Sequence, residues 1–137
     1  MLTVRGPDRL QGVDLDLSGC AELAPVVTTV AACAAGQSSI TGIAHTRLHE
    51  SDRIAVMATE LNRCGAGVTE LADGLVVQPR PLHGELIRTY DDHRIAMSAA
   101  VLGLVVPGTR VENVETAGKT VPDFAQWWQA TVTVEHA

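Results

Sequence analysis

The chain has 137 residues and a formal net charge of −6, and it contains no block of basic residues. Its length allows one domain with a substantial core and is short for a two-domain enzyme. The acidic balance argues against nucleic acid and against an anionic membrane as partners, whereas a small anionic ligand is compatible with cations placed locally.

Aliphatic side chains must build the core, because 46% of the residues are hydrophobic and only 3% are aromatic. Residues 1–17 predict two short strands around a turn at 6–8, and residues 22–35 predict a helix with Pro25 in its first turn. Because this helix is apolar almost all round, we expect it to be buried between layers. A strand over 39–43 follows.

The next helix has the clearest pattern in the sequence. Its apolar residues recur from Ile54 to Leu61 with the spacing of one helical face. Ser51 or Asp52 is the expected N-cap, and Gly65 is the expected end. The polar segment before this helix therefore lies at the positive end of a helix dipole, where anions are favoured.

A hairpin is predicted next, with strands over 67–71 and 75–78 around Asp73-Gly74. A short strand is expected over 85–89. The helix after it is capped by Asp91 or Asp92 and runs to about residue 105, where Pro107-Gly108 breaks it.

The end of the chain predicts one more strand and one more helix. The strand covers 109–114, and the helix starts near Thr120 or Val121 with Pro122 in its first turn. The two halves of the chain then repeat one another at a spacing of roughly 71 residues, each as helix, strand, polar segment and helix. Four helix N-termini would occupy equivalent positions and could form one anion site.

The cysteines and the apolar runs indicate the cellular environment of the chain. Cys20, Cys33 and Cys64 are an odd number without a C-x-x-C pair, so we expect neither a disulfide framework nor a structural zinc site. No leader follows Met1, and the apolar run over 95–106 is interrupted and too short to cross a bilayer. We expect a soluble cytoplasmic chain with no membrane contact.

Arg53, Arg94 and Lys119 are candidate clamps for a phosphate or a carboxylate. Arginine offers a planar fork of donors that matches an oxyanion, and lysine supplies a compact charge. The alternative is an ion pair between each cation and a nearby aspartate of the sequence, at 52, 91 or 92. Both arginines lie in the first turn of a predicted helix, where a fixed cation is unfavourable and requires an anion nearby.

Glu22 and Glu50 are candidates for proton transfer or for binding a hydroxyl group, with helix capping as the alternative for Glu22. His45, His49 and His93 could be zinc ligands, but the first two precede a helix and no thiolate pairs with them. We therefore expect no metal site and no cofactor. A glycine-rich phosphate loop and a G-x-S-x-G motif are both missing from the sequence.

Three motifs in a fixed order carry a resemblance to a known family. They are H-E-S-D-R at 49–53, D-H-R-I-A-M at 92–97 and K-T-V-P-D-F at 119–124. Their order and spacing resemble the C-terminal part of 5-enolpyruvylshikimate-3-phosphate synthase, and the wording at 45–50 is most similar to actinobacterial members. The resemblance runs from about Gly19 to the end of the chain and corresponds to roughly the last third of a family member.

This resemblance implies an activity and a fold. The family transfers the enolpyruvyl group of phosphoenolpyruvate to the 5-hydroxyl of shikimate 3-phosphate and releases phosphate, a step of aromatic amino-acid biosynthesis. Its α/β (α+β) fold is an inside-out α/β barrel whose two domains each contain three βαβαββ units. The chain would then be a partial C-terminal domain with roughly two such units, about 15–85 and 86–137, the second incomplete.

The matched motifs also imply roles for particular residues. Arg53, Arg94 and Lys119 would grip phosphoenolpyruvate with His93 beside them, and Glu50 would lie near the methylene that gains and loses a proton.

Glu22 would face the reacting hydroxyl, and His45 and His49 would contact shikimate 3-phosphate. Many members of the family have Asp, Asn and Lys at these three positions, so the shikimate side departs further from the family pattern than the phosphoenolpyruvate side.

The resemblance further implies a missing partner. The other domain of the family supplies most of the shikimate 3-phosphate contacts, so we expect this chain to need a complementary N-terminal domain and to be inactive alone. Two alternatives stay open: a relative of UDP-N-acetylglucosamine enolpyruvyl transferase, and a non-catalytic anion-binding or interaction module with the same fold.

Overall fold

A computed structural model of the protein describes residues 1–132 and has the mixed α/β class expected from the sequence. The first half contains the elements β1 (Asp14–Asp16), η1 (Ala21–Leu23), α1 (Ala24–Ala32), β2 (Ser38–Thr41), η2 (Ala44–Leu48), α2 (Arg53–Arg63), β3 (Gly67–Leu71) and β4 (Gly74–Gln78). The second half contains β5 (Leu86–Ile87), α3 (His93–Leu102), β6 (Arg110–Val111), η3 (Val114–Lys119) and α4 (Phe124–Val132). The elements labelled η are 3₁₀ helices.

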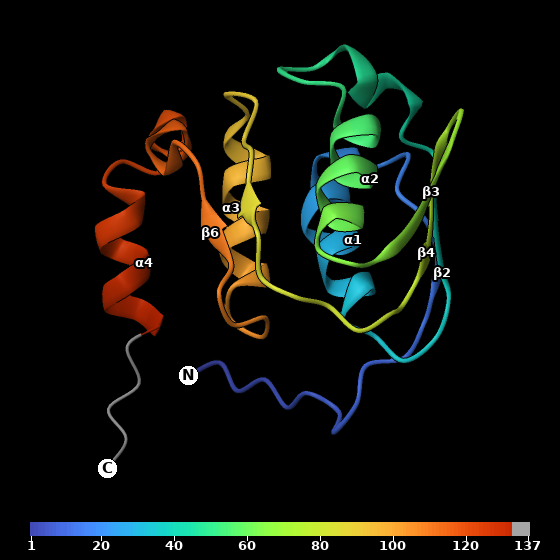
Figure 1. The fold of residues 1–137 in the computed structure, drawn as a ribbon, viewed down its shortest axis with the longest axis horizontal. Coiled ribbons are helices and arrows are strands. Elements are labelled where there is room, and N and C mark those ends of the chain that lie inside the picture. The colour runs from blue at the N-terminus through green and yellow to red at the C-terminus, as the bar shows by residue number, and fades with distance from the viewer. Residues whose placement is uncertain (133–137) are drawn as a thin grey trace.

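The first half is a four-stranded sheet covered on one face by α1 and α2 (Figure 1). The strand order is β1-β2-β4-β3, with β1 parallel to β2 and the other neighbours antiparallel. Alternate residues of the strands, such as Ile40, Leu75 and Val77, point into the core and are almost completely buried. The predicted hairpin is confirmed, with β3 and β4 paired in register around its turn.

The second half adds α3, which packs against α1, and a two-stranded parallel sheet of β5 and β6. Helix α4 is farther from the main sheet than α3 and the β5–β6 sheet are (Figure 1). Phe124 anchors α4 in a small apolar cluster with Ala96, Ala100 and Ala117. The element order is βαβαββ from β1 to β4 and βαβα from β5 onward. The assignment of these two groups to units of a larger domain stays a prediction.

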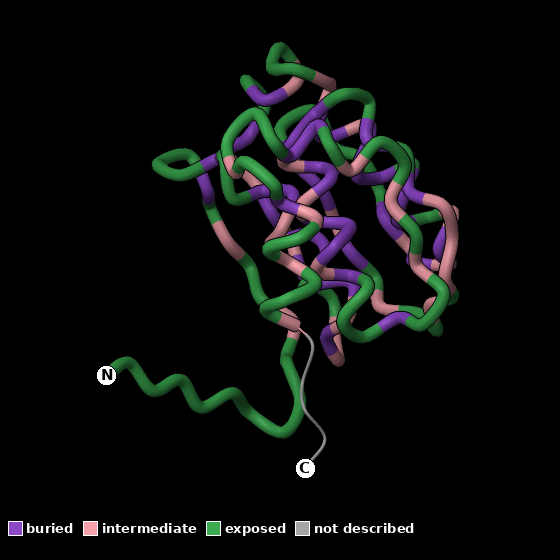
Figure 2. Tube along the Cα trace, turned by 90° about the vertical axis from the view of Figure 1, so that its left-hand side faces the viewer, coloured by how far each residue is buried: buried purple, intermediate pink, exposed green. Residues whose placement is uncertain are grey.

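The structure differs from the sequence expectations mainly at the N-terminus. Only the second of the two strands predicted in residues 1–17 forms, as β1; residues 1–9 form no strand and are exposed (Figure 2). The helix expected over 22–35 begins as the 3₁₀ turn η1 and ends at Ala32. It is also not buried all round, since Val30 is 39% exposed.

Three further predicted ends of helices and strands were wrong, because the backbone turns earlier or later than the sequence pattern indicated. Helix α3 ends at Leu102 rather than near 105, and the strand over 109–114 shortens to β6 because Asn113 is left-handed (φ 46°). The last helix begins at Phe124, not at 120 or 121, because Asp123 is also left-handed (φ 55°) and separates Pro122 from the helix. Part of the polar segment before α2 forms the 3₁₀ helix η2.

One feature of the fold positions the polar motifs. Helices α1, α2 and α3 all begin at the same end of the molecule, at the top of Figure 1. The segments that precede them are therefore neighbours in space although they lie far apart in the sequence. Within the described residues, no helix is long and apolar enough to span a membrane.

Candidate anion-binding site

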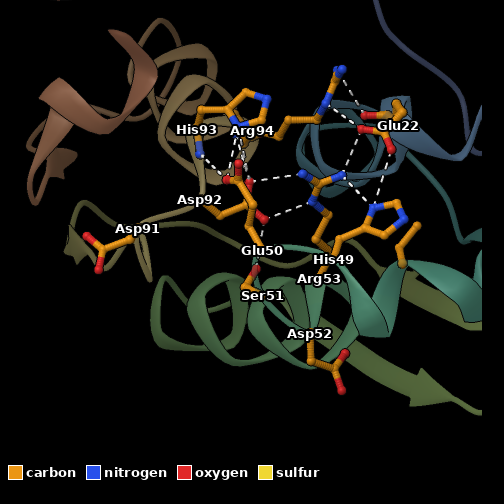
Figure 3. Close-up of polar contacts among 12 residues, drawn as sticks. Glu22, His49, Glu50, Ser51, Asp52, Arg53, Asp91, Asp92, His93 and Arg94 are labelled. Atoms are coloured by element: carbon orange, nitrogen blue, oxygen red, sulfur yellow. Dashed lines mark hydrogen bonds and ion pairs between the residues drawn. The ribbon is translucent and has the colours of Figure 1, made fainter. Parts of the chain in front are cut away.

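The candidate site lies where the first turns of α1, α2 and α3 meet (Figure 3). Aspartates start two of these helices, and each is one of the two alternatives that the sequence offered. Asp52 caps α2 by accepting a hydrogen bond from the amide of Ala55 at 3.1 Å, and Asp92 caps α3 by accepting from the amide of Arg94 at 2.9 Å. Capping fixes the helix starts and so fixes the directions of the side chains that follow them.

Arg53 and Asp92 form a buried ion pair at the centre of the site. Arg53 Nε lies 2.8 Å from Asp92 Oδ2 and Nη2 lies 3.2 Å from Oδ1, so both carboxylate oxygens are engaged. Arg53 is 3% exposed and Asp92 is 0% exposed. Ser51 donates a further hydrogen bond to Asp92 at 2.9 Å. This pair joins the start of α2 to the start of α3.

Glu22 gathers the cations on the α1 side of the site. Its Oε2 lies 2.8 Å from Arg53 Nη1 and 2.6 Å from Arg94 Nε, and its Oε1 lies 3.3 Å from His49 Nδ1 (Figure 3). Arg94 Nη1 also donates to the backbone carbonyl of Glu22 at 3.3 Å. Both Glu22 and Arg94 remain partly exposed, with 48% and 34% of their side chains in contact with solvent.

Glu50 gathers a second group on the α3 side. Its Oε2 accepts from the amide of His93 at 3.3 Å, lies 3.0 Å from His93 Nδ1, and lies 3.6 Å from Lys119 Nζ. Lys119 also donates to the backbone carbonyl of Asp91. The structure therefore brings Arg53, Arg94 and Lys119 to one end of the molecule, where a ligand could replace the exposed carboxylates of Glu22 and Glu50.

The electrostatics of the three carboxylates follow from this arrangement. Burial raises the pKa of each of Glu22, Glu50 and Asp92, but hydrogen bonds from cationic or amide groups outweigh it and leave each pKa below its ordinary value. The groups responsible are mainly Arg53 for Glu22 and Asp92, and His93 for Glu50. All three carboxylates are therefore ionised at neutral pH.

An incoming oxyanion would meet donors that are already in position. Arg53 is fixed by Asp92, and the first turns of α2 and α3 add a favourable dipole. Glu22 and Glu50 now neutralise the outward-facing cations, and both are exposed enough to be displaced by a ligand carboxylate or phosphate. The arrangement can bind an anion with several negative oxygens.

Two of the aspartates considered as ion-pair partners lie outside this cluster. Asp52 and Asp91 point away from it (Figure 3). Asp52 pairs with Arg47 at 3.0 Å, and Asp91 accepts from the side chain of Asn113 at 2.8 Å. His45 is more peripheral, since it reaches the cluster through an edge-on ring contact with His49 at 5.7 Å between centroids.

Glu50, Asp92 and His93 each offer a ligand atom within 4.8 Å of one another and could in principle hold a metal ion. Arg53 already engages both oxygens of Asp92, and Lys119 lies beside Glu50. A metal cation would have to compete with Arg53 and Lys119 for the same carboxylate oxygens, so the donor set fits an anion better than a cation.

A large cavity among the described residues lies away from these side chains. It has a volume of about 680 Å³ and is lined by the segments that follow the ends of α1 and α3, around residues 33–37 and 105–107. Glu22 and Arg94 instead line a smaller cavity of about 220 Å³ between α1 and α3. The charged cluster marks the candidate site better than cavity size does, because it alone combines helix N-termini with convergent cations.

Sequence reasoning did not foresee the double role of Asp92. It was considered as a helix cap and as an ion-pair partner, but its burial and its two-oxygen contact with Arg53 come from packing. Ser51, the alternative to Asp52 as the cap of α2, instead donates to Asp92. The signal available in the sequence was the run of Asp, His and Arg at 92–94, directly before an apolar helix.

Comparison with known proteins supplies an independent finding. The family profile described as EPSP synthase (3-phosphoshikimate 1-carboxyvinyltransferase) matches residues 1–128. The chain is 50% identical over 135 residues to a protein of the actinobacterium Kocuria rhizophila described as 3-phosphoshikimate 1-carboxyvinyltransferase. The match covers 98% of this chain and 30% of that relative, so the chain spans about a third of the relative's length.

Two solved structures are similar to the chain. An EPSP synthase structure from Acinetobacter baumannii superposes with a TM-score of 0.78 and 32% sequence identity, covering 90% of this chain and 30% of that one. A second EPSP synthase structure from the same species gives a TM-score of 0.68 and 33% identity over 77% of this chain and 25% of that one. The mixed α/β arrangement is thus similar to part of a larger fold.

Proposed function

The chain belongs to the EPSP synthase family, and we propose that it forms the phosphoenolpyruvate side of an active site that transfers enolpyruvyl to the 5-hydroxyl of shikimate 3-phosphate. Phosphate would be released in this reaction, which serves aromatic amino-acid biosynthesis. The proposal concerns only the part of the active site that this chain contributes, because the relative that it matches is about three times as long.

A single observation carries the proposal: three cations from separate motifs converge beside two displaceable carboxylates. Arg53 and Arg94 share the carboxylate of Glu22, and Lys119 lies beside Glu50. Phosphoenolpyruvate carries a phosphate and a carboxylate, and bidentate arginines suit both groups. We propose that these cations, with His93, bind phosphoenolpyruvate in place of Glu22 and Glu50, while Asp92 keeps its contact with Arg53.

The two glutamates would then do the proton chemistry. Displacement of Glu50 from His93 and Lys119 by an anion would place negative charge near it and raise its low pKa, which suits a group that takes up and returns a proton at the methylene carbon. Glu22 would face the reacting hydroxyl, and His45 and His49, on the same side as Glu22, would contact shikimate 3-phosphate.

The site as described is open to solvent on one side. Because Glu22 and Lys119 are half exposed, a second surface would be required to exclude water and complete the binding of substrate. We propose that a complementary N-terminal domain supplies this surface. The chain alone would then bind phosphoenolpyruvate weakly and turn nothing over. A cytoplasmic location agrees with a small-molecule biosynthetic role and with three free cysteines.

Titration calorimetry of the chain tests this proposal. Phosphoenolpyruvate, shikimate 3-phosphate and the two together are titrated with and without a complementary N-terminal fragment of the relative. The expected result is phosphate release only in the complete mixture, with phosphoenolpyruvate bound more tightly there than by the chain alone. Steady phosphate release by the chain alone would contradict the requirement for a partner, and no response to any combination would favour a non-catalytic module.

Variants at Arg94 sharpen the same experiment. Arg94→Glu reverses the charge and should abolish the phosphoenolpyruvate response, while Arg94→Lys keeps the charge but loses the planar fork and should weaken it. Arg110→Glu is the matched control, because Arg110 is exposed on β6 and reverses the same charge outside the cluster. An Arg94→Glu isotherm equal to that of Arg110→Glu would contradict the assigned clamp.

A further inference from the structure

The backbone directly before α3 is strained. Tyr90 and Asp91 both have left-handed conformations, with φ values of 53° and 55°. Residues with a side chain adopt this region rarely, and two in succession cost free energy that the surroundings must offset. The segment of Thr89, Tyr90 and Asp91, called the α3 connector below, therefore needs contacts that hold it in place.

A carboxylate on α2 supplies one of these contacts. Glu60 is 2% exposed, and its Oε1 accepts a hydrogen bond from the Tyr90 hydroxyl at 2.9 Å. Its Oε2 accepts from the backbone amide of Arg88 at 3.0 Å and from Arg63 Nη1 at 2.6 Å. One buried group thus contacts the chain just before the α3 connector and within it, while Arg63 balances its charge.

The Tyr90 hydroxyl remains a donor at physiological pH. Burial raises the pKa of Tyr90, and the hydrogen bond to Glu60 raises it further. On the opposite side, Asn113 donates to the Asp91 side chain at 2.8 Å, and Lys119 donates to the Asp91 carbonyl. The α3 connector is therefore held from both sides.

The position of the α3 connector determines the position of the site residues that follow it. The amide of Asp92 donates to the carbonyl of Thr89 at 2.9 Å, which closes the turn. Asp92 then caps α3 and engages Arg53, and His93 contacts Glu50 through both its amide and its ring. A relaxation of Tyr90 towards an extended conformation would rotate all of these groups.

We propose that Glu60 is a positioning residue which, through Tyr90, holds the α3 connector and thereby sets the orientation of His93 and Arg94 for binding an oxyanion. Glu60 touches neither His93 nor Arg94 in its own hydrogen bonds, and its carboxylate lies on the side of α2 that faces β5 and the α3 connector. The identity of the ligand rests on the proposed function, whereas the orientation of His93 can be measured without any ligand.

Two conservative variants and one control test this inference. Tyr90→Phe removes only the hydroxyl, and Glu60→Gln keeps an acceptor of the same shape. Asn62→Ala is the control on the same helix, because Asn62 makes two hydrogen bonds to the backbone of Val68, away from the α3 connector. The first measurement is the ¹⁵N resonance of the His93 ring, which reports its hydrogen bond to Glu50 and requires no substrate.

Tyr90→Phe and Glu60→Gln should both shift the His93 ring resonance, whereas Asn62→Ala should lower stability and leave this resonance unchanged. In the complete mixture with the N-terminal fragment, Tyr90→Phe should weaken phosphoenolpyruvate binding about three- to tenfold, the range expected for one lost hydrogen bond. If Glu60→Gln does not fold, Tyr90→Phe decides the question alone.

An unchanged His93 resonance in Tyr90→Phe would overturn the inference, as would an equal change in Asn62→Ala. Because the resonance is measured on the unliganded chain, this result is independent of whether the site binds phosphoenolpyruvate. A shifted resonance without any phosphoenolpyruvate binding would support the positioning role of Glu60 and contradict the proposed function.

Discussion

The candidate site has an inner and an outer layer of carboxylates, which differ in how they hold their cations. The inner layer is Asp92, which is completely buried and engages Arg53 with both oxygens. The outer layer is Glu22 and Glu50, whose side chains are 48% and 36% exposed. The ion pair of Asp92 is therefore a permanent part of the fold, whereas solvent can replace the ion pairs of Glu22 and Glu50.

This difference separates structure from ligand binding. A buried ion pair that loses one partner leaves an uncompensated charge in a poorly solvated place, which is strongly destabilising. An exposed pair contributes little, because water and salt screen it. The inner layer therefore fixes Arg53 in place, and the outer layer keeps the remaining cations neutralised until an anion arrives.

Of the changes that test this difference between the layers, Asp92→Asn should lower the free energy of unfolding most. The variant removes the buried counter-charge of Arg53, leaves it only half-exposed Glu22 as a partner, and weakens the cap of α3, so it should destabilise the chain by about 3 kcal/mol or more. Urea unfolding of the variant and of the wild type measures the difference. A loss below about 1 kcal/mol would show that the buried pair is replaceable.

A smaller effect is expected from acid. The pKa values of Asp92, Glu22 and Glu50 are lower in the folded chain than their ordinary values, so their stabilisation is fully present above the unfolded pKa values and is lost as pH falls through the folded ones. The free energy of unfolding should therefore fall below about pH 4.

The stability that is lost in acid should come more from Asp92 than from Glu22 and Glu50. Asp92→Asn should have a shallower decline with pH than the wild type, because the most buried of the three carboxyls no longer titrates. Unfolding curves collected from neutral pH downward in both proteins measure this decline. Parallel declines would place the acid sensitivity in other carboxylates.

The smallest effect is expected from Glu22→Gln. Since Glu22 is half exposed, the loss of its charge should change the free energy of unfolding by about 0–1 kcal/mol. The same unfolding experiment measures this value beside that of Asp92→Asn. A destabilisation equal to that of Asp92→Asn would contradict the division into two layers and make the whole cluster one structural unit.

Local rules predicted much of the fold and the residue types of the candidate site. The spacing of Ile54 to Leu61 gave the face of α2, Asp52 and Asp92 were among the expected caps, and Asp73-Gly74 marked the hairpin. These features depend on neighbouring residues and on short side chains that bond their own backbone.

The missed features depend on contacts between distant parts of the chain. The hydrogen bond from Tyr90 to Glu60 joins residues 30 apart, and no local pattern requires either the burial of Glu60 or the left-handed backbone at Tyr90. The short strand β6 and the late start of α4 likewise follow from left-handed Asn113 and Asp123, which propensity alone does not reveal.

The position of β1 has a consequence for the order in which the fold assembles and opens. The hairpin of β3 and β4 closes over a two-residue turn, whereas β1 pairs only with β2, about 25 positions onward, and has three residues. Contacts between distant segments form late and open early, so amide protons of β1 should exchange with deuterated water sooner than those of β4. Because β1 leads into η1, which carries Glu22, opening of β1 would loosen Glu22 first, whereas the Arg53–Asp92 pair joins α2 to α3 and would stay closed.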